Sequence, residues 1–474
     1  MDRSSSHAAE YDDVPVPEDV APNLSSYNSL INAWAKSGLP EAGRRAQSIL
    51  DYINGRTILT SLFHPVTGEI RYKAYGYTPH ADVVTYNSVM NAWARCRDDD
   101  GKGPERAERV LDEMLSGGSP AGFDGSGNLE LARPNNVSFG TVVYAWTKSR
   151  GARGAERAEA VLGKMEAYYD DDDDVVVGRR GRRVGTAASS CYAGVVFGYA
   201  DRAGTDADPP EEGGSGGGAY AGRAQDVLDR MTAATGSPPI TSVRNAVLEA
   251  WARDLNRRTP EKEGGGGGDG YDDTDGDGIV LVKLRRAQSV LNSMIDDAKR
   301  EPRNAPCHPD PASFRALFEA CGSYRVLRSS SPRVRGESLS ALRDGLRRMA
   351  EAGGGGYLRR RGEGRGGGGG GGAYAAAMRS ILGLLPDDDG AEERVETLRG
   401  VARMCVERGG ATTTAAMGEV MSVAERAGDA VTLDILRGGG GEGSGSEFEV
   451  RGKVRVGASR SPGLKSSSPE LYYS

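Results

Sequence analysis

The sequence predicts an all-α protein, an α-solenoid of stacked antiparallel helical hairpins. In residues 83–117, apolar side chains recur at offsets of three, four and seven residues in two runs, which a turn containing glycines and Pro104 separates. All four tryptophans fall at one position of the first run of a repeat, and each follows an alanine. The second run carries a signature that recurs five times, as RAQSIL, RAERVL, RAEAVL, RAQDVL and RAQSVL. One hairpin could not bury such faces, so the repeat predicts a stack.

The hairpins can be followed along the chain, each with a first helix (helix A) and a second helix (helix B). Helix A is expected near residues 24–34, 83–93, 136–146, 192–199, 247–251, 314–321, 374–381 and 417–424. Helix B is expected near residues 46–53, 107–114, 158–165, 224–231, 287–294, 342–349 and 398–405. The tryptophans lie on the apolar face of helix A, which predicts that they are core residues between hairpins; they are Trp34, Trp93, Trp146 and Trp251.

Composition changes divide the chain into segments. The hairpins predict a repeat domain of about six units at residues 24–350, a glycine-rich linker at 351–372 and degenerate helical repeats at 373–437. Long Gly/Asp-rich insertions inside two hairpins, at 203–219 and 259–278, and the two chain ends, at 1–23 and 438–474, are predicted to be disordered. Residues 54–79 are rich in Thr, Val, Ile and Tyr around a Pro-Val-Thr-Gly turn, which predicts a short β-hairpin that projects from the stack.

The charge balance limits the partners. With a net charge of -7, the chain lacks the strong basic excess of proteins that hold nucleic acid mainly by phosphate attraction, so a nucleic-acid role must rest on a local surface. The five cysteines are scattered without a CxxC pair, which argues against a disulfide scaffold or zinc knuckle and favours a reducing compartment. No apolar run reaches the roughly 20 residues that span a bilayer, so no membrane partner is expected.

One segment carries a family resemblance. The residues VVTYNSVMNAWAR followed by ERAERVLDEML, with Pro-Asn or Pro-Asp closing the previous unit, resemble the pentatricopeptide repeat (PPR) family over about residues 24–350. The tetratricopeptide repeat fits less well, because helix A lacks its Gly and Tyr pattern. The resemblance implies a PPR/TPR-like superhelix that binds single-stranded RNA, one nucleotide per repeat, on the surface of the A helices.

In that family, the residue after the helix A aromatic and the last residue of the repeat together read one base. The matching pairs are Asn28 with Asp82 and Asn245 with Asp310, which imply uracil, and Asn87 with Asn135, which implies a pyrimidine. An apolar residue near the start of the repeat packs against the base, and here Val84 and Val137 occupy that position. A short amide suits this role because it can both donate to and accept from a Watson–Crick edge.

The resemblance weakens in the other repeats. Gly140 with Ala188 and Ala193 with Ile240 offer no hydrogen-bonding pair, and Arg315 has no family precedent. Each asparagine alone would be read as a tolerated polar residue on an exposed helix face, whereas its recurrence at one repeat position favours reading. We therefore expect a short, discontinuous, pyrimidine-favouring readout.

Other candidate chemistry is weaker. Asp273, Asp275, Asp277 and Gly278 resemble the start of a calcium loop, but Leu284 stands where its closing glutamate belongs, which favours a solvated acidic loop. Cys307 and His308 lie between prolines in a connector and are interpreted as an ordinary loop. The sequence predicts no catalytic residue, no metal site and no cofactor, and therefore no enzyme.

The sequence thus predicts a non-catalytic, single-stranded RNA-binding adaptor in organellar RNA processing, stability or translation. The alternative is a helical scaffold for protein partners without sequence-specific RNA binding, which the acidic net charge and the non-reading repeats favour. The resemblance implies a mitochondrion or plastid. The first residues are acidic, unlike a transit peptide, so either no presequence exists or the start of the chain is missing, and the cytoplasm and nucleus stay open.

Overall fold

A computed structural model shows the architecture. It describes residues 22–54, 81–96, 101–116, 132–149, 153–170, 188–205, 219–257, 273–300, 307–329, 331–354, 371–385, 391–407 and 414–437. The expected β-hairpin at 54–79 lies outside the described residues apart from Asn54. The same holds for most of the chain ends predicted to be disordered and of the insertion at 203–219.

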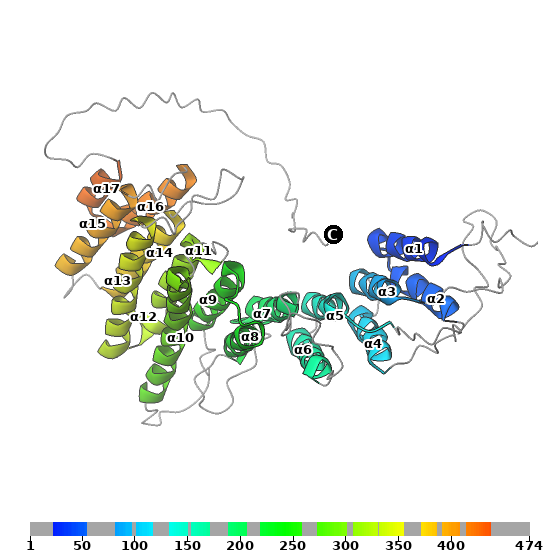
Figure 1. Ribbon diagram of the computed structural model, residues 1–474. Helices are drawn as coiled ribbons and strands as arrows, with labels where there is room; N and C mark the ends of the chain where they lie inside the picture. Colours follow the sequence, from blue (N-terminus) through cyan, green and yellow to red (C-terminus); the bar gives the residue numbers. More distant parts are fainter. Residues whose placement is uncertain are drawn as a thin grey trace, which may run out of the picture.

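The described residues form helices arranged as hairpins (Figure 1). The A helices are α1 (Leu24–Ser37), α3 (Val83–Arg95), α5 (Asn136–Lys148), α7 (Ser189–Arg202), α9 (Thr241–Asn256), α11 (Pro311–Cys321), α14 (Gly371–Leu384) and α16 (Thr414–Ala427). The B helices are α2 (Ala42–Ile53), α4 (Gly103–Leu115), α6 (Gly154–Asp170), α8 (Ala219–Thr235), α10 (Asp273–Arg300), α13 (Pro332–Gly354), α15 (Ala391–Glu407) and α17 (Ala430–Arg437). The short α12 (Tyr324–Arg328) lies between α11 and α13.

The A helices make one continuous layer. Each contacts the next A helix, from α1 through α16, while each B helix packs on the A helix of its own hairpin. From α2 to α13, each B helix also contacts the following A helix, so it bridges two units. Figure 1 shows the hairpins following one another as a curved stack. The predicted all-α solenoid is confirmed, and no strand occurs among the described residues.

The structure differs from the prediction in detail. Helix α10 begins at Asp273, so residues 273–278 are helical, although their Gly/Asp composition predicted a loop. The prediction of a solvated acidic loop is therefore wrong for these residues, and the helix also lacks the turn that a calcium loop needs at its glycine. Helices α12 and α17 were not predicted, because each is too short to show a helical period. The helices α14 and α16 extend the A layer beyond α11.

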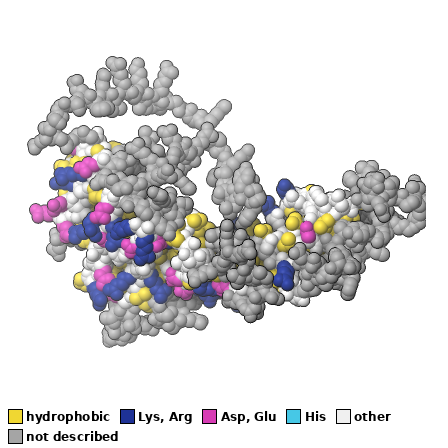
Figure 2. All heavy atoms as spheres, in the orientation of Figure 1, with side chains coloured by type: hydrophobic (Ala, Val, Ile, Leu, Met, Phe, Trp, Pro, Cys, Tyr) yellow, Lys and Arg dark blue, Asp and Glu magenta, His cyan; other side chains and the backbone are white. Residues whose placement is uncertain are grey.

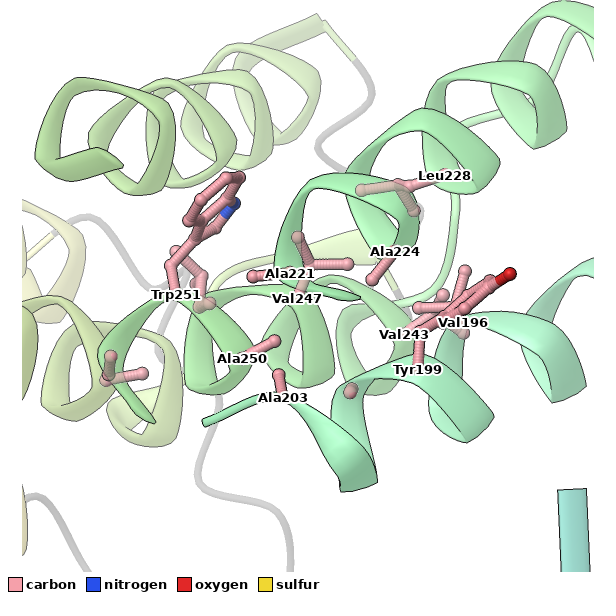
Figure 3. Packing of buried hydrophobic residues seen from close by; sticks show 14 of the residues in the cluster. Val196, Tyr199, Ala203, Ala221, Ala224, Leu228, Val243, Val247, Ala250 and Trp251 are labelled. Carbon is pink, nitrogen blue, oxygen red and sulfur yellow. The ribbon is translucent and has the colours of Figure 1, made fainter. Parts of the chain in front are cut away.

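The repeated apolar positions form the core. Tyr86, Val89, Met90 and Trp93 of α3 are all buried, as are Ala107, Val110, Leu111 and Met114 of α4. Figure 3 shows the same arrangement further along, where side chains of α7, α8 and α9 meet and the Trp251 ring projects from α9. Small residues of α8, Ala221 and Ala224, are fully buried there and permit close helix packing.

The tryptophans fill the space between consecutive hairpins, though to different extents. Trp93 and Trp251 are 4% and 0% exposed, whereas Trp34 and Trp146 are only partly buried, so the core prediction applies fully to two of the four. The Trp146 indole Nε1 donates a hydrogen bond of 2.8 Å to Glu108 of the preceding B helix. The tryptophan therefore joins one hairpin to the next.

The arginine of the helix B signature has a structural function that the sequence did not suggest. It lies over the aromatic ring of its own helix A, at 4.8 Å for Arg106 on Trp93, 5.2 Å for Arg157 on Trp146 and 5.7 Å for Arg286 on Trp251. In the fourth hairpin Arg223 lies 5.8 Å from the Tyr199 ring. Such cation–π contacts explain why arginine accompanies the aromatic residue in each repeat.

Candidate nucleic-acid interface

The predicted reading pairs lie where one A helix meets the start of the next. Asp82, Asn135 and Asp310 are the N-cap residues of α3, α5 and α11. Asp and Asn favour this position because their side-chain oxygen accepts hydrogen bonds from the free backbone N–H groups of the first turn. Since neighbouring A helices pack side by side, each N-cap lies next to the first turn of the previous A helix.

The first pair is in contact. Asn28 Nδ2 donates to Asp82 Oδ1 at 3.4 Å, and Asn28 Oδ1 accepts from the Thr85 hydroxyl at 2.8 Å. Thr85 also completes a capping box with Asp82, whose Oδ1 accepts from the Thr85 backbone N–H at 2.8 Å. The three side chains form one hydrogen-bonded group, which we call a polar triad.

The same triad recurs twice. Asn87 Nδ2 donates to Asn135 Oδ1 at 3.4 Å, and Ser138 donates to Asn87 Oδ1 at 2.7 Å. In the fifth hairpin, Asn245 Nδ2 donates to Asp310 Oδ1 at 3.0 Å, and Ser313 donates to Asn245 Oδ1 at 2.6 Å. The structure therefore brings together all three sequence-predicted pairs.

The triads leave defined atoms unused. In Asp82 and Asp310 the side-chain hydrogen bonds all fall on Oδ1, so Oδ2 has no hydrogen-bond partner in the described part of the chain. In Asn135 they fall on Oδ1 likewise, which leaves the Nδ2 donor without one there. An Asp triad thus presents an acceptor, and the Asn triad presents a donor.

Exposure differs among the three asparagines that are predicted to read a base. Asn28 and Asn87 are partly exposed, but Asn245 is only 9% exposed. In the fifth hairpin the asparagine therefore serves mainly to link α9 to α11, and Asp310 offers the more accessible polar atom. Val84 and Val137 are 53% and 48% exposed near the starts of α3 and α5, as a residue that packs against a base must be.

The other repeats lack the whole triad. Where Asn is replaced by Gly140 or Ala193, the N-cap is Ala188 or Ile240. The hydroxyl position three residues into the helix is then Cys191 or Val243, in place of Thr85, Ser138 or Ser313. Sequence reasoning missed these hydroxyl residues, although the capping-box pattern of Asp or Asn followed by Ser or Thr three residues later would have found them.

Arg315 occupies the reader position of α11 and has another function. Its guanidinium lies 3.7 Å from Glu249 of α9 and 3.8 Å from Glu319 of its own helix. It therefore bridges two A helices through exposed ion pairs and is not placed as a base reader. On the face drawn in Figure 2, basic and acidic side chains alternate in this way over the C-terminal helices.

The first three A helices each carry a basic residue near the C-terminal end, opposite the end where the predicted reading position lies. Lys36, Arg95 and Lys148 are exposed and lie in the last turns of α1, α3 and α5. The fourth hairpin has Asp201 at the equivalent position. The fifth hairpin has Arg253 there, but its guanidinium donates to Glu249 and to the Ala200 carbonyl oxygen. The first three hairpins therefore carry a row of basic residues that can contact phosphates, which an acidic protein needs for binding nucleic acid.

The remaining candidate groups are structural. Cys307 and His308 are buried, with Cys307 Sγ donating to Pro238 O at 3.3 Å and His308 O accepting from Thr241 at 2.6 Å, so this connector docks against the start of α9. Burial raises the pKa of Cys191 and of Cys321 to about 12, which keeps both thiols protonated. In the residues that the structure describes, no group of three or more His, Cys, Asp or Glu side chains could hold a metal ion. Within the same residues, no helix is long and apolar enough to cross a membrane.

The stack of hairpins and the polar triads together define the class of protein. It is a helical-repeat protein whose A helices carry polar groups at spaced positions. A family model described as PPR repeat matches residues 25–45, which span most of α1 and the beginning of α2. This match supports the resemblance to the PPR family. No curated protein and no solved structure matched the chain.

Proposed function

We propose that this protein is a non-catalytic adaptor that binds single-stranded RNA along its A helices and favours pyrimidines. The observation that carries the proposal is the triad, which holds each predicted reader asparagine against a neighbouring N-cap and leaves one polar side-chain atom of that cap without a hydrogen bond among the described residues. A fixed side chain pays little entropy on binding, so its free atom can select a base.

The chemistry of the unused atoms supports the base preference. Oδ2 of Asp82 accepts, and it suits the N3–H donor of uracil. Nδ2 of Asn135 donates, and it suits the ring nitrogen of cytosine or a carbonyl oxygen of either pyrimidine. Val84 and Val137 then cover the faces of the bases, and Lys36, Arg95 and Lys148 contact phosphates.

Replacing the two accessible readers tests the function. We expect Asn28→Ala/Asn87→Ala to bind a U-rich single-stranded RNA roughly tenfold more weakly than the wild type, because each net hydrogen bond contributes about 0.5–1.5 kcal/mol. Fluorescence anisotropy at physiological salt measures this, with an A-rich RNA of equal length for comparison. Asn292→Ala, on the B helix α10, is the matched control and should bind as the wild type does. Equal wild-type affinity for the U-rich and A-rich strands would contradict the proposal.

Replacing the Asn135 amide group with a carboxylate tests how this position selects a base. Asn135→Asp replaces the free donor with an acceptor, and we expect the preference at that nucleotide to move from cytosine towards uracil by several-fold. Asp and Asn cap helices equally well, so α5 should be retained, and circular dichroism checks this. The measurement is the ratio of affinities for RNAs that differ only in one C or U. An unchanged ratio in the variant would show that Nδ2 does not face the base.

The site of action is part of the proposal. We propose a mitochondrial or plastid location and an RNA processing, stability or translation role, on the family resemblance alone. Imaging of the full-length chain fused at its C-terminus to a fluorescent protein tests the location. Nuclear or cytoplasmic signal would contradict the organellar location. The alternative function, a helical scaffold for protein partners, is tested by the RNA-binding measurements above.

A further inference from the structure

Two neighbouring hairpins carry exposed aromatic rings on the A-helix face. Tyr144 of α5 is 45% exposed, and Phe197 of α7 is 39% exposed. Exposed apolar side chains that form one contiguous patch mark interaction sites, whereas isolated ones are ordinary. Neither ring is in contact with another aromatic ring, and the Tyr144 hydroxyl has no hydrogen-bond partner, among the residues that the structure describes. Each side chain therefore keeps exposed apolar surface that a ligand can contact.

The rings occur where the reader is missing. In the hairpins with a reader asparagine, the residue one helical turn further on is polar, namely Asn32, Asn91 and Glu249. In the two hairpins whose reader is Gly140 or Ala193, that residue is Tyr144 or Phe197. An aromatic ring thus occurs in the same hairpins in which a small residue replaces the asparagine. This pairing indicates that hydrogen bonding to a base is replaced there by contact with a ring.

The helices that carry the two rings pack closely. Gly194 and Gly198 of α7 face α5, and a Cβ atom there would lie 2.9 Å from Val143 and 2.8 Å from Thr147. Val143 and Gly198 are the chain neighbours of Tyr144 and Phe197. Because α5 and α7 approach this closely, their exposed rings lie on one continuous surface between the readers on either side.

Apolar side chains and triads bound this surface. Val137, near the start of α5, and Ile240, the N-cap of α9, are both 48% exposed. The triad that contains Asn135 lies at the start of α5, and the triad that contains Asn245 lies on α9. Tyr144 of α5 and Phe197 of α7 lie on the successive A helices between these triads, so a strand that follows the A helices from one triad to the other passes these rings.

We propose that Tyr144 and Phe197 form a stacking spacer, which holds two nucleobases of the single strand without selecting their identity. This proposal rests on the proposed function, since the same RNA must contact the flanking triads. Stacking tolerates any base because every base has a π face. The protein then reads two separate blocks, one at Asn28 and Asn87 and the other at Asn245 with Asp310, with two unread positions between them.

RNA probes that remove bases test the spacer. A pair of adjacent abasic sites is moved stepwise along a U-rich single strand, and the affinity of the full chain is measured at each step. We expect one window where any of the four bases is accepted with affinities within about twofold, yet where the abasic pair weakens binding about tenfold. Sensitivity to base identity throughout, or no such window, would overturn the proposal.

Variants then assign the window to the rings. Tyr144→Ala/Phe197→Ala should lose the abasic effect while keeping the pyrimidine preference that Asn28 and Asn87 provide. Tyr144→Phe should retain the effect, and Val282→Ala, an exposed apolar residue on the B helix α10, should change nothing. If the double alanine variant binds every probe as the wild type does, the rings do not contact the RNA and the spacer is wrong. If the wild type binds no RNA, the proposed function fails as well, so the two failures differ.

Discussion

Replacing Asp254 with alanine is expected to lower the free energy of unfolding by about 3–5 kcal/mol. Asp254 of α9 lies 2.9 Å from the Lys283 ammonium of α10, and the two side chains are only 2% and 0% exposed. The substitution leaves the Lys283 charge buried without this carboxylate, and the cost of that desolvation is not recovered. Urea unfolding followed by circular dichroism measures the loss.

A pair on the same helix supplies the control. Asp296 lies 3.9 Å from Lys299 of α10, with exposed fractions of 58% and 67%, so Asp296→Ala should cost less than about 1 kcal/mol. Replacing both members of the buried pair, as Asp254→Leu/Lys283→Met, should recover most of the stability because no buried charge is left. A double variant as unstable as Asp254→Ala would show that packing, rather than the uncompensated charge, determines the loss.

The sequence predicted the stack well because its signal is local. Apolar offsets within each helix, such as those that end in Trp93 and Met114, require only a helical period to place residues on one face. The Lys283–Asp254 pair could not be predicted in this way, since it depends on how α10 packs against α9 across an intervening segment of variable length. Contacts between residues far apart in the sequence leave no periodic pattern in it, so they cannot be predicted from periodicity.

The candidate interface was predictable in part. The resemblance supplied Asn28 with Asp82, and the structure places the two in contact, but it did not reveal that Asp82 is also the helix N-cap. A residue-by-residue transfer treats the pair as two readers, whereas the geometry shows a triad in which Thr85 holds both. The low exposure of Asn245 depends on packing in the fifth hairpin, which no repeat pattern reports.

Trp93→Ala is the second large effect, expected to lower the free energy of unfolding by about 3–5 kcal/mol. The ring lies between Arg106 of its own hairpin and Gly43 of the previous B helix, and its Nε1 donates to Gln47 at 3.2 Å. Trp34→Ala is the matched control at the equivalent position. It should cost clearly less, because the Trp34 ring is only partly buried and less apolar surface returns to water.

Gly43 allows the cause to be isolated. A Cβ atom on Gly43 would lie 2.1 Å from the Trp93 ring, so Gly43→Ala should itself destabilise the protein by about 1–3 kcal/mol. In the Trp93→Ala background the added methyl group enters vacated space, and alanine also forms helix better than glycine by about 1 kcal/mol, so the sign should reverse. The double-mutant cycle measures this coupling by urea unfolding of all four chains. An equal cost of Gly43→Ala in both backgrounds would mean that the two hairpins do not meet through this ring, and that the tryptophan repeat stabilises each hairpin separately.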